Sequence, residues 1–104
     1  MEASPELLRF DGLVIDTARR HVSRQGADVA LTGTEYELLL MLAREPGRVF
    51  SRDDILERLR GHAAEDIQTR AVDLLVSRLR RKLEPLAFIK TLRNAGYTFA
   101  GVRR

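Results

Sequence analysis

Residues 70–84, RAVDLLVSRLRRKLE, decide the fold of this 104-residue chain. At 100° per residue, their side chains separate into an apolar stripe and a basic face. The stripe consists of Val72, Val76, Leu79 and Leu83, with Leu75 at its edge. We expect it to be buried, because an amphipathic helix turns its apolar side to the core. The helix should begin near Asp66 or Ile67 and end at Glu84, since Pro85 follows.

The outer face of this predicted helix carries cations almost alone, whereas a helix built only for solubility interleaves acidic and basic residues. Leu74 also lies there, although exposure brings a leucine no stability; a thymine methyl would give it an apolar partner. Seven of the nine cations in residues 68–104 are Arg. The planar fork of Arg suits phosphates and guanine edges. The alternative is an ordinary solvated face, but we favour a helix that lies in a DNA major groove.

Charge and composition narrow the class of protein. Residues 68–104 carry nine Lys or Arg against two Asp or Glu, whereas residues 1–67 carry nine against thirteen, which predicts an anionic partner for one face. The absence of cysteine excludes disulfides, thiolate zinc sites and cysteine nucleophiles. The longest apolar run, residues 38–43, is far shorter than the roughly 20 residues of a membrane span, and the amino terminus has no signal-peptide pattern. We therefore expect a cytoplasmic protein without a membrane contact.

The first sixty residues predict a small sheet followed by two helices. Short segments between turn residues in residues 7–31 predict an antiparallel meander, and they read LLRF, LVID, RHVSR and DVAL. Two capping boxes, each with a hydroxyl residue and a carboxylate three positions later, are Thr32 with Glu35 and Ser51 with Asp54. They predict a central helix at about 33–44 and a second at about 52–60. Residues 48–50 predict a short strand.

The carboxy-terminal residues predict a β-hairpin. Segments 88–92 and 97–102 flank RNAG, in which Asn94 and Gly96 are able to take positive φ. We place Thr91 and Arg93 at the tip beside Asn94, where a guanidinium would enter a minor groove or bind phosphate. The alternative for Arg93 is an ordinary exposed turn residue.

Other candidate sites are weak. His21 and His62 have no neighbouring ligands at metal spacing. Acidic residues in the first turn of a helix complement its dipole, which explains Asp53, Asp54, Glu57, Glu65 and Asp66. The sequence has no glycine-rich phosphate loop and no nucleophile motif, and its few aromatic residues disfavour an RNA-stacking platform. We therefore expect no enzyme activity, no metal and no cofactor.

In this order, the elements resemble the OmpR/PhoB winged-helix effector domain of bacterial two-component response regulators. The resemblance covers residues 7–102, and its motifs are LTGTEYELLLMLAREPGRVFSRDDIL (31–56), RAVDLLVSRLRRKLE (70–84) and IKTLRNAGYTF (89–99). It implies an α+β winged helix-turn-helix with an amino-terminal four-stranded antiparallel sheet, a three-helix core and a carboxy-terminal β-hairpin wing. The domain would span residues 7–104, and residues 1–6 would be a linker remnant or disordered tail.

The resemblance also implies roles for individual residues. The helix at about 67–84 would lie in the major groove, and the wing at 88–100 would reach the adjacent minor groove. Base contacts fall on Arg78, Leu74 and Ala71, to which the helical wheel adds Arg81. Phosphate contacts fall on Arg70, Ser77, Arg80 and Thr91, to which the wheel adds Lys82. The wing contact is Arg93, beside Asn94, which replaces the glycine usual in the family. The polymerase-facing loop is Gly61, His62, Ala63, Ala64 and Glu65, without the usual aromatic residue.

The partners implied by the resemblance are double-stranded DNA and RNA polymerase. Members of the family bind direct-repeat operators as head-to-tail dimers, downstream of a receiver domain and a sensor kinase. Since 104 residues do not hold a receiver domain, we expect either an excised effector domain or a free-standing regulator. The alternative function is a winged-helix module for protein contact, whose basic face docks on an acidic partner or on RNA polymerase.

Overall fold

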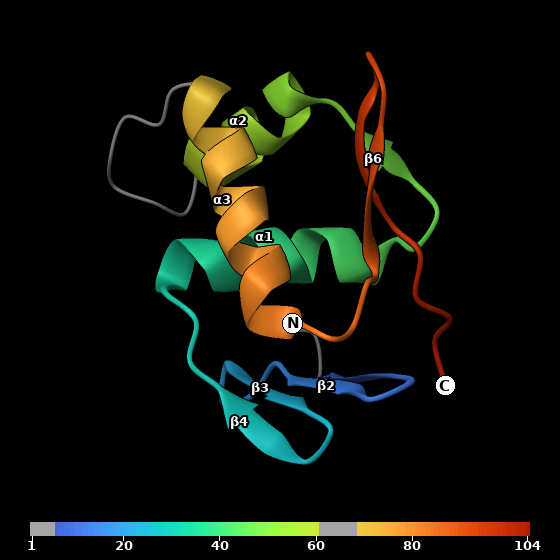
Figure 1. Cartoon of the computed structure of the whole chain (residues 1–104). Helices are drawn as coiled ribbons and strands as arrows, with labels where there is room; N and C mark the ends of the chain where they lie inside the picture. Colours follow the sequence, from blue (N-terminus) through green and yellow to red (C-terminus); the bar gives the residue numbers. More distant parts are fainter. Residues whose placement is uncertain (1–5, 61–68) are drawn as a thin grey trace, which may run out of the picture.

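The amino-terminal residues form an antiparallel meander at one end of the molecule (Figure 1). The computed structural model describes residues 6–60 and 69–104. The four strands pair in sequence order and are β1 (Leu7–Phe10), β2 (Leu13–Asp16), β3 (His21–Arg24) and β4 (Ala27–Val29). Leu8 lies opposite Ile15, which lies opposite Val22, and all three are buried. The predicted sheet is confirmed, although β3 begins after Arg20, whose φ of 53° takes it out of the strand.

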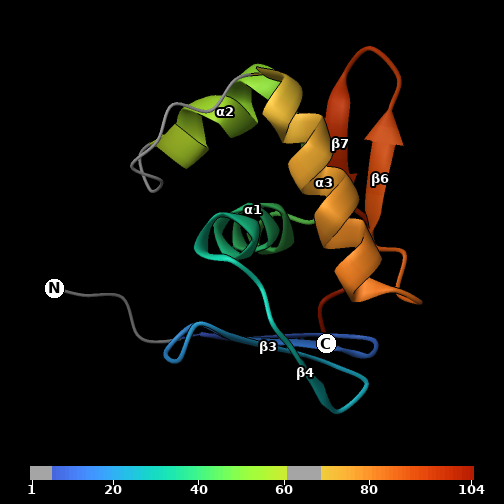
Figure 2. The ribbon, with the colours of Figure 1, turned by 60° about the vertical axis from the view of Figure 1, so that its left-hand side comes forward.

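Helix α1 (Gly33–Arg44) lies between this sheet and the second helix, α2 (Arg52–Arg60) (Figure 2). Its predicted capping box is present: the Thr32 hydroxyl accepts from the Glu35 N–H at 3.1 Å, and the Glu35 carboxylate accepts from the Thr32 N–H at 3.0 Å. Eight of its twelve residues are buried, which confirms the prediction of a central helix. Helix α2 begins with the second capping box, in which Ser51 and Asp54 bond each other's backbone at 3.0 and 3.1 Å.

Helix α3 (Thr69–Leu83) packs its predicted stripe into the core. The four stripe residues are at most 1% exposed: Val72, Val76, Leu79 and Leu83. The helix ends at Leu83, one residue earlier than predicted, because Glu84 precedes Pro85 and is itself the disfavoured position. The predicted start near Asp66 or Ile67 lies outside the described residues, as does most of the predicted tail. Within the described ranges, no helix combines the length and the apolar character needed to cross a bilayer.

A second sheet carries the predicted wing. Strand β7 (Gly96–Phe99) lies between β5 (Val49–Phe50) and β6 (Ile89–Leu92). The β6–β7 turn places Asn94 at a φ of 63° and Gly96 at 134°, so both take the positive φ that was predicted. Strand β7 is shorter than predicted because the following residues leave the hairpin and reach β1, where the Arg104 N–H donates to the Arg9 carbonyl at 2.8 Å.

The arrangement confirms the predicted fold class, an α+β winged helix with a four-stranded sheet, three helices and a carboxy-terminal hairpin. Both views show the turn of the hairpin and the amino-terminal end of α3 at the same end of the molecule, away from the four-stranded sheet (Figures 1 and 2). This end therefore presents residues from two elements to one partner.

Candidate nucleic-acid interface

The outer face of α3 is exposed to solvent, as the helical wheel predicted. Leu74 is 50% exposed, and Arg78 and Arg81 are exposed on the same side because they follow it by four and seven positions. Arg70 and Ser77 are exposed as well. Ala71 is half-buried and packs against the core, so it offers a smaller surface than the other predicted base contacts.

Arg80, predicted to contact phosphate, is held by the wing. Its Nε donates to the Ile89 carbonyl at 3.1 Å and its Nη2 donates to the Thr91 hydroxyl at 2.6 Å. Two of its three guanidinium nitrogens are thus used inside the protein. Its phosphate contact stays a prediction, and the structure adds a second role, since Arg80 joins α3 to β6.

Lys82, the other flanking cation, is tied to the start of α1. Its Nζ lies 2.6 Å from Glu35 Oε1, and its carbonyl accepts from Arg24 Nη1 at 2.7 Å. Burial raises the pKa of Glu35, but the hydrogen bonds from Lys82 and from the Thr32 backbone outweigh it and leave the pKa below the ordinary value. Glu35 is therefore charged at neutral pH and retains Lys82, so a phosphate contact by Lys82 would compete with this ion pair.

The wing turn presents Arg93 and Asn94 to solvent, with Leu92 exposed beside them. The prediction that Thr91 lies at the tip is wrong. Thr91 lies inside β6, opposite Tyr97, because the turn begins only after Leu92, whose carbonyl accepts from the Ala95 N–H at 2.9 Å. The Thr91 hydroxyl is consequently directed to α3 and accepts the hydrogen bond from Arg80.

One cluster beside this face was not predicted. Asp73 Oδ1 accepts from the Tyr97 hydroxyl at 2.5 Å and from Arg52 Nε at 2.7 Å, so residues of three elements meet at one oxygen. The hydrogen bonds from Tyr97 and then from Arg52 hold the pKa of Asp73 below its ordinary value, while burial and the Asp73 carboxylate raise the pKa of Tyr97. A signal was available in the sequence, since Asp73 is the single acidic residue in residues 69–83.

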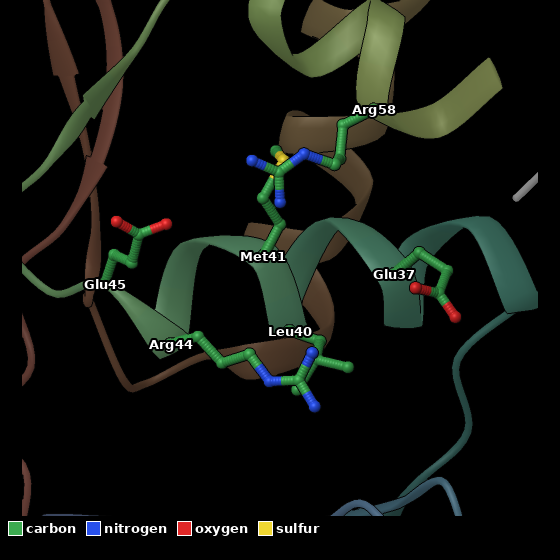
Figure 3. A pocket seen from close by; sticks show the side chains of 6 residues that line it. All are labelled: Glu37, Leu40, Met41, Arg44, Glu45 and Arg58. Carbon is green, nitrogen blue, oxygen red and sulfur yellow. The ribbon is translucent and has the colours of Figure 1, made fainter. Parts of the chain in front are cut away.

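A pocket at α1 and α2 is lined by none of these residues (Figure 3). Its lining consists of Glu37, Leu40, Met41, Arg44, Glu45 and Arg58. Three of the charged groups at its rim are already paired: Glu37 with Arg20, Arg44 with Glu6 and Glu45 with Arg48. We assign it no function. The predicted polymerase-facing loop, Gly61 to Glu65, lies outside the described residues.

Comparison with known proteins gives the family. A family model described as "Transcriptional regulatory protein, C terminal" matches residues 26–99. The transcriptional regulatory protein RstA of Escherichia coli is 41% identical over 98 residues, which are 89% of this chain and 40% of that protein. The chain thus spans about two fifths of the length of this relative.

Two solved structures share the fold. The DNA-binding domain of Klebsiella pneumoniae RstA, in complex with the RstA box, is 38% identical with a TM-score of 0.80, and the match covers 91% of this chain and 97% of that one. The response regulator DrrB, an OmpR/PhoB homologue from Thermotoga maritima, is 32% identical with a TM-score of 0.81, over 91% of this chain and 44% of that one. With a family model that matches most of its residues, the chain belongs to the OmpR/PhoB-type family of transcriptional regulatory protein C-terminal domains.

Proposed function

We propose that this domain binds double-stranded DNA sequence-specifically as the output domain of a two-component response regulator. The observation that carries the proposal is the exposed stripe of Leu74, Arg78 and Arg81, which lies directly opposite the buried stripe of α3, the helix that Arg80 joins to the wing. An exposed leucine among guanidinium groups fits a base edge with its methyl and acceptor groups better than it fits water. The similarity to an RstA domain in complex with its DNA box supports the same function.

In this proposal α3 lies in the major groove and the wing reaches the adjacent minor groove. Arg78 reads a base, Leu74, Ala71 and Arg81 support it, and Arg93 beside Asn94 enters the minor groove. Phosphate contacts come from Arg70, Ser77, Thr91, Arg80 and Lys82, the last two in competition with their partners inside the protein. The domain itself needs no catalytic group for this function.

The wider assembly also belongs to the proposal. We infer head-to-tail dimers on a direct-repeat operator, a contact of residues 61–65 with RNA polymerase, and cytoplasmic control by a receiver domain and a sensor kinase in a longer protein. The family membership supports these partners, and the operator is to be found by selecting bound duplexes from a random library.

Binding to duplex DNA should weaken steeply with salt. Neutralisation of each phosphate releases counterions, so the association constant should fall by roughly 0.9 log unit per contact for each tenfold rise in salt. The measurement is fluorescence anisotropy with the selected duplex over a salt series, with a folded acidic protein as the competing partner. Failure to bind any duplex at low salt, together with retention of the acidic protein, would favour a protein-docking module instead.

Arg78→Ala should relax base discrimination. Loss of a bidentate base contact should cost roughly 1 to 3 kcal/mol with the selected duplex and far less with random duplex. Arg19→Ala is the matched control, because it removes an exposed Arg near the turn between β2 and β3, away from α3. If Arg78→Ala weakens selected and random duplexes equally, Arg78 does not read a base.

A further inference from the structure

Tyr97 is the centre of the contacts between the wing and the helices. The guanidinium carbons of Arg52 and Arg80 lie 5.6 and 5.5 Å from the centre of its ring. Its hydroxyl donates to Asp73, which also accepts from Arg52. Asp73 and Arg80 are seven residues apart, about two helical turns, so both project from the side of α3 that faces the wing. These four residues, Arg52, Asp73, Arg80 and Tyr97, are called the wing latch.

The backbone alone attaches the hairpin weakly to the rest of the domain. Strand β7 pairs with β5 through two residue pairs, Val49 with Thr98 and Phe50 with Tyr97, and one further backbone bond runs from the Gly47 N–H to the Phe99 carbonyl at 2.9 Å. A two-stranded hairpin on its own is marginally stable in water. Side-chain contacts are therefore needed to hold the hairpin at one angle to α3.

The wing latch contains two polar groups that core packing alone does not require, the hydroxyl of Tyr97 and the carboxylate of Asp73. Tyr97 is buried, and a phenylalanine would fill nearly the same volume without a hydroxyl to satisfy. Asp73 is the single acid of α3, on a helix whose partner is proposed to be a polyanion that repels carboxylates. The two groups explain each other, because the Asp73 carboxylate accepts the hydrogen bond from the Tyr97 hydroxyl and Arg52 balances the charge of the carboxylate.

We propose that the wing latch fixes the position of the wing relative to α3, so that Arg93 meets the minor groove when Arg78 meets the major groove. The inference rests on the proposed DNA binding and adds the positioning residues to it. A wing that is already in place avoids the entropic cost of ordering the hairpin on binding. Arg80 takes part as a second anchor through Ile89 and Thr91.

The first test needs no DNA. Tyr97→Phe removes only the hydroxyl, and backbone ¹⁵N relaxation then reports motion in residues 91–95. We expect order parameters to fall from about 0.85 in the original chain to below about 0.6 in the variant. Tyr36→Phe is the matched control, since Tyr36 is also buried but its hydroxyl has no hydrogen-bond partner in the described ranges. A wing that stays as rigid in Tyr97→Phe as in Tyr36→Phe would overturn the latch.

The second test measures coupling on DNA by a double-mutant cycle. Arg93→Ala should weaken binding to the selected duplex about tenfold in the original chain but only about twofold in the Tyr97→Phe background, because a displaced wing no longer presents Arg93 to its groove. Structural damage unrelated to the wing would leave the cost of Arg93→Ala unchanged. Equal costs in the two backgrounds would therefore contradict the proposal.

The two tests separate the latch from the proposed function. If the original chain binds no duplex, DNA binding fails while the relaxation data still decide the latch. If Tyr97→Phe does not fold, Asp73→Asn removes the accepting charge from the helix side at nearly constant shape, and the same two measurements are applied to it.

Discussion

Gly96→Ala should be the most damaging single substitution in the wing. Gly96 has a φ of 134°, a region that L-residues rarely adopt, and an added Cβ would overlap the Phe50 carbonyl oxygen and lie 2.9 Å from Ser51 Cα. Both neighbours are backbone atoms where β5 leads into α2, so neither is able to rotate away. We expect a loss of about 4 kcal/mol or more in the free energy of unfolding, measured by urea denaturation.

The control for this prediction is Gly26→Ala. Gly26 also has a positive φ, 83°, but an added Cβ meets nothing within 4 Å. It should therefore show only the conformational cost of placing an L-residue there, about 1 to 2 kcal/mol. Equal losses in the two variants would mean that the close approach between β5 and β7 does not limit the fold.

The elements could be predicted because their signals are local. Each capping box lies within four residues, and the four-residue stripe of α3 follows from the helical period alone, so the helices and the buried face were found without a structure. The turn at Asn94 was predicted for the same reason, since asparagine tolerates the left-handed region.

The partners of the site residues could not be predicted because they come from distant positions. Lys82 was placed on a flank of α3, which gives its direction, but the sequence does not show that this flank faces Glu35, 47 positions earlier. The bond from Tyr97 to Asp73 spans 24 positions. The helical wheel thus separates core residues from surface residues. Whether a surface cation has an acidic partner depends on tertiary packing, which the wheel does not contain.

Leu79→Ala should destabilise the fold strongly, whereas Leu74→Ala on the same helix should not. Leu79 is fully buried in the centre of the core stripe, so truncation leaves a cavity and should cost about 2 to 5 kcal/mol in the free energy of unfolding. Leu74 is half exposed, and its truncation should change that free energy by no more than about 0.5 kcal/mol. Urea denaturation gives the free energy of unfolding of the two variants and so compares the same Leu→Ala change at a buried and at a half-exposed position.

DNA binding should rank the two variants in the opposite order. At a temperature where both are folded, Leu79→Ala should bind the selected duplex almost as the original chain does, because its side chain lies on the far side of α3 from the proposed contact. Leu74→Ala should bind the selected duplex more weakly and leave binding to random duplex unchanged, since it removes an apolar base contact and no charge. If Leu74→Ala instead binds both duplexes like the original chain, the leucine on the basic face has no role in reading DNA, and the base contacts are reduced to those of the arginines.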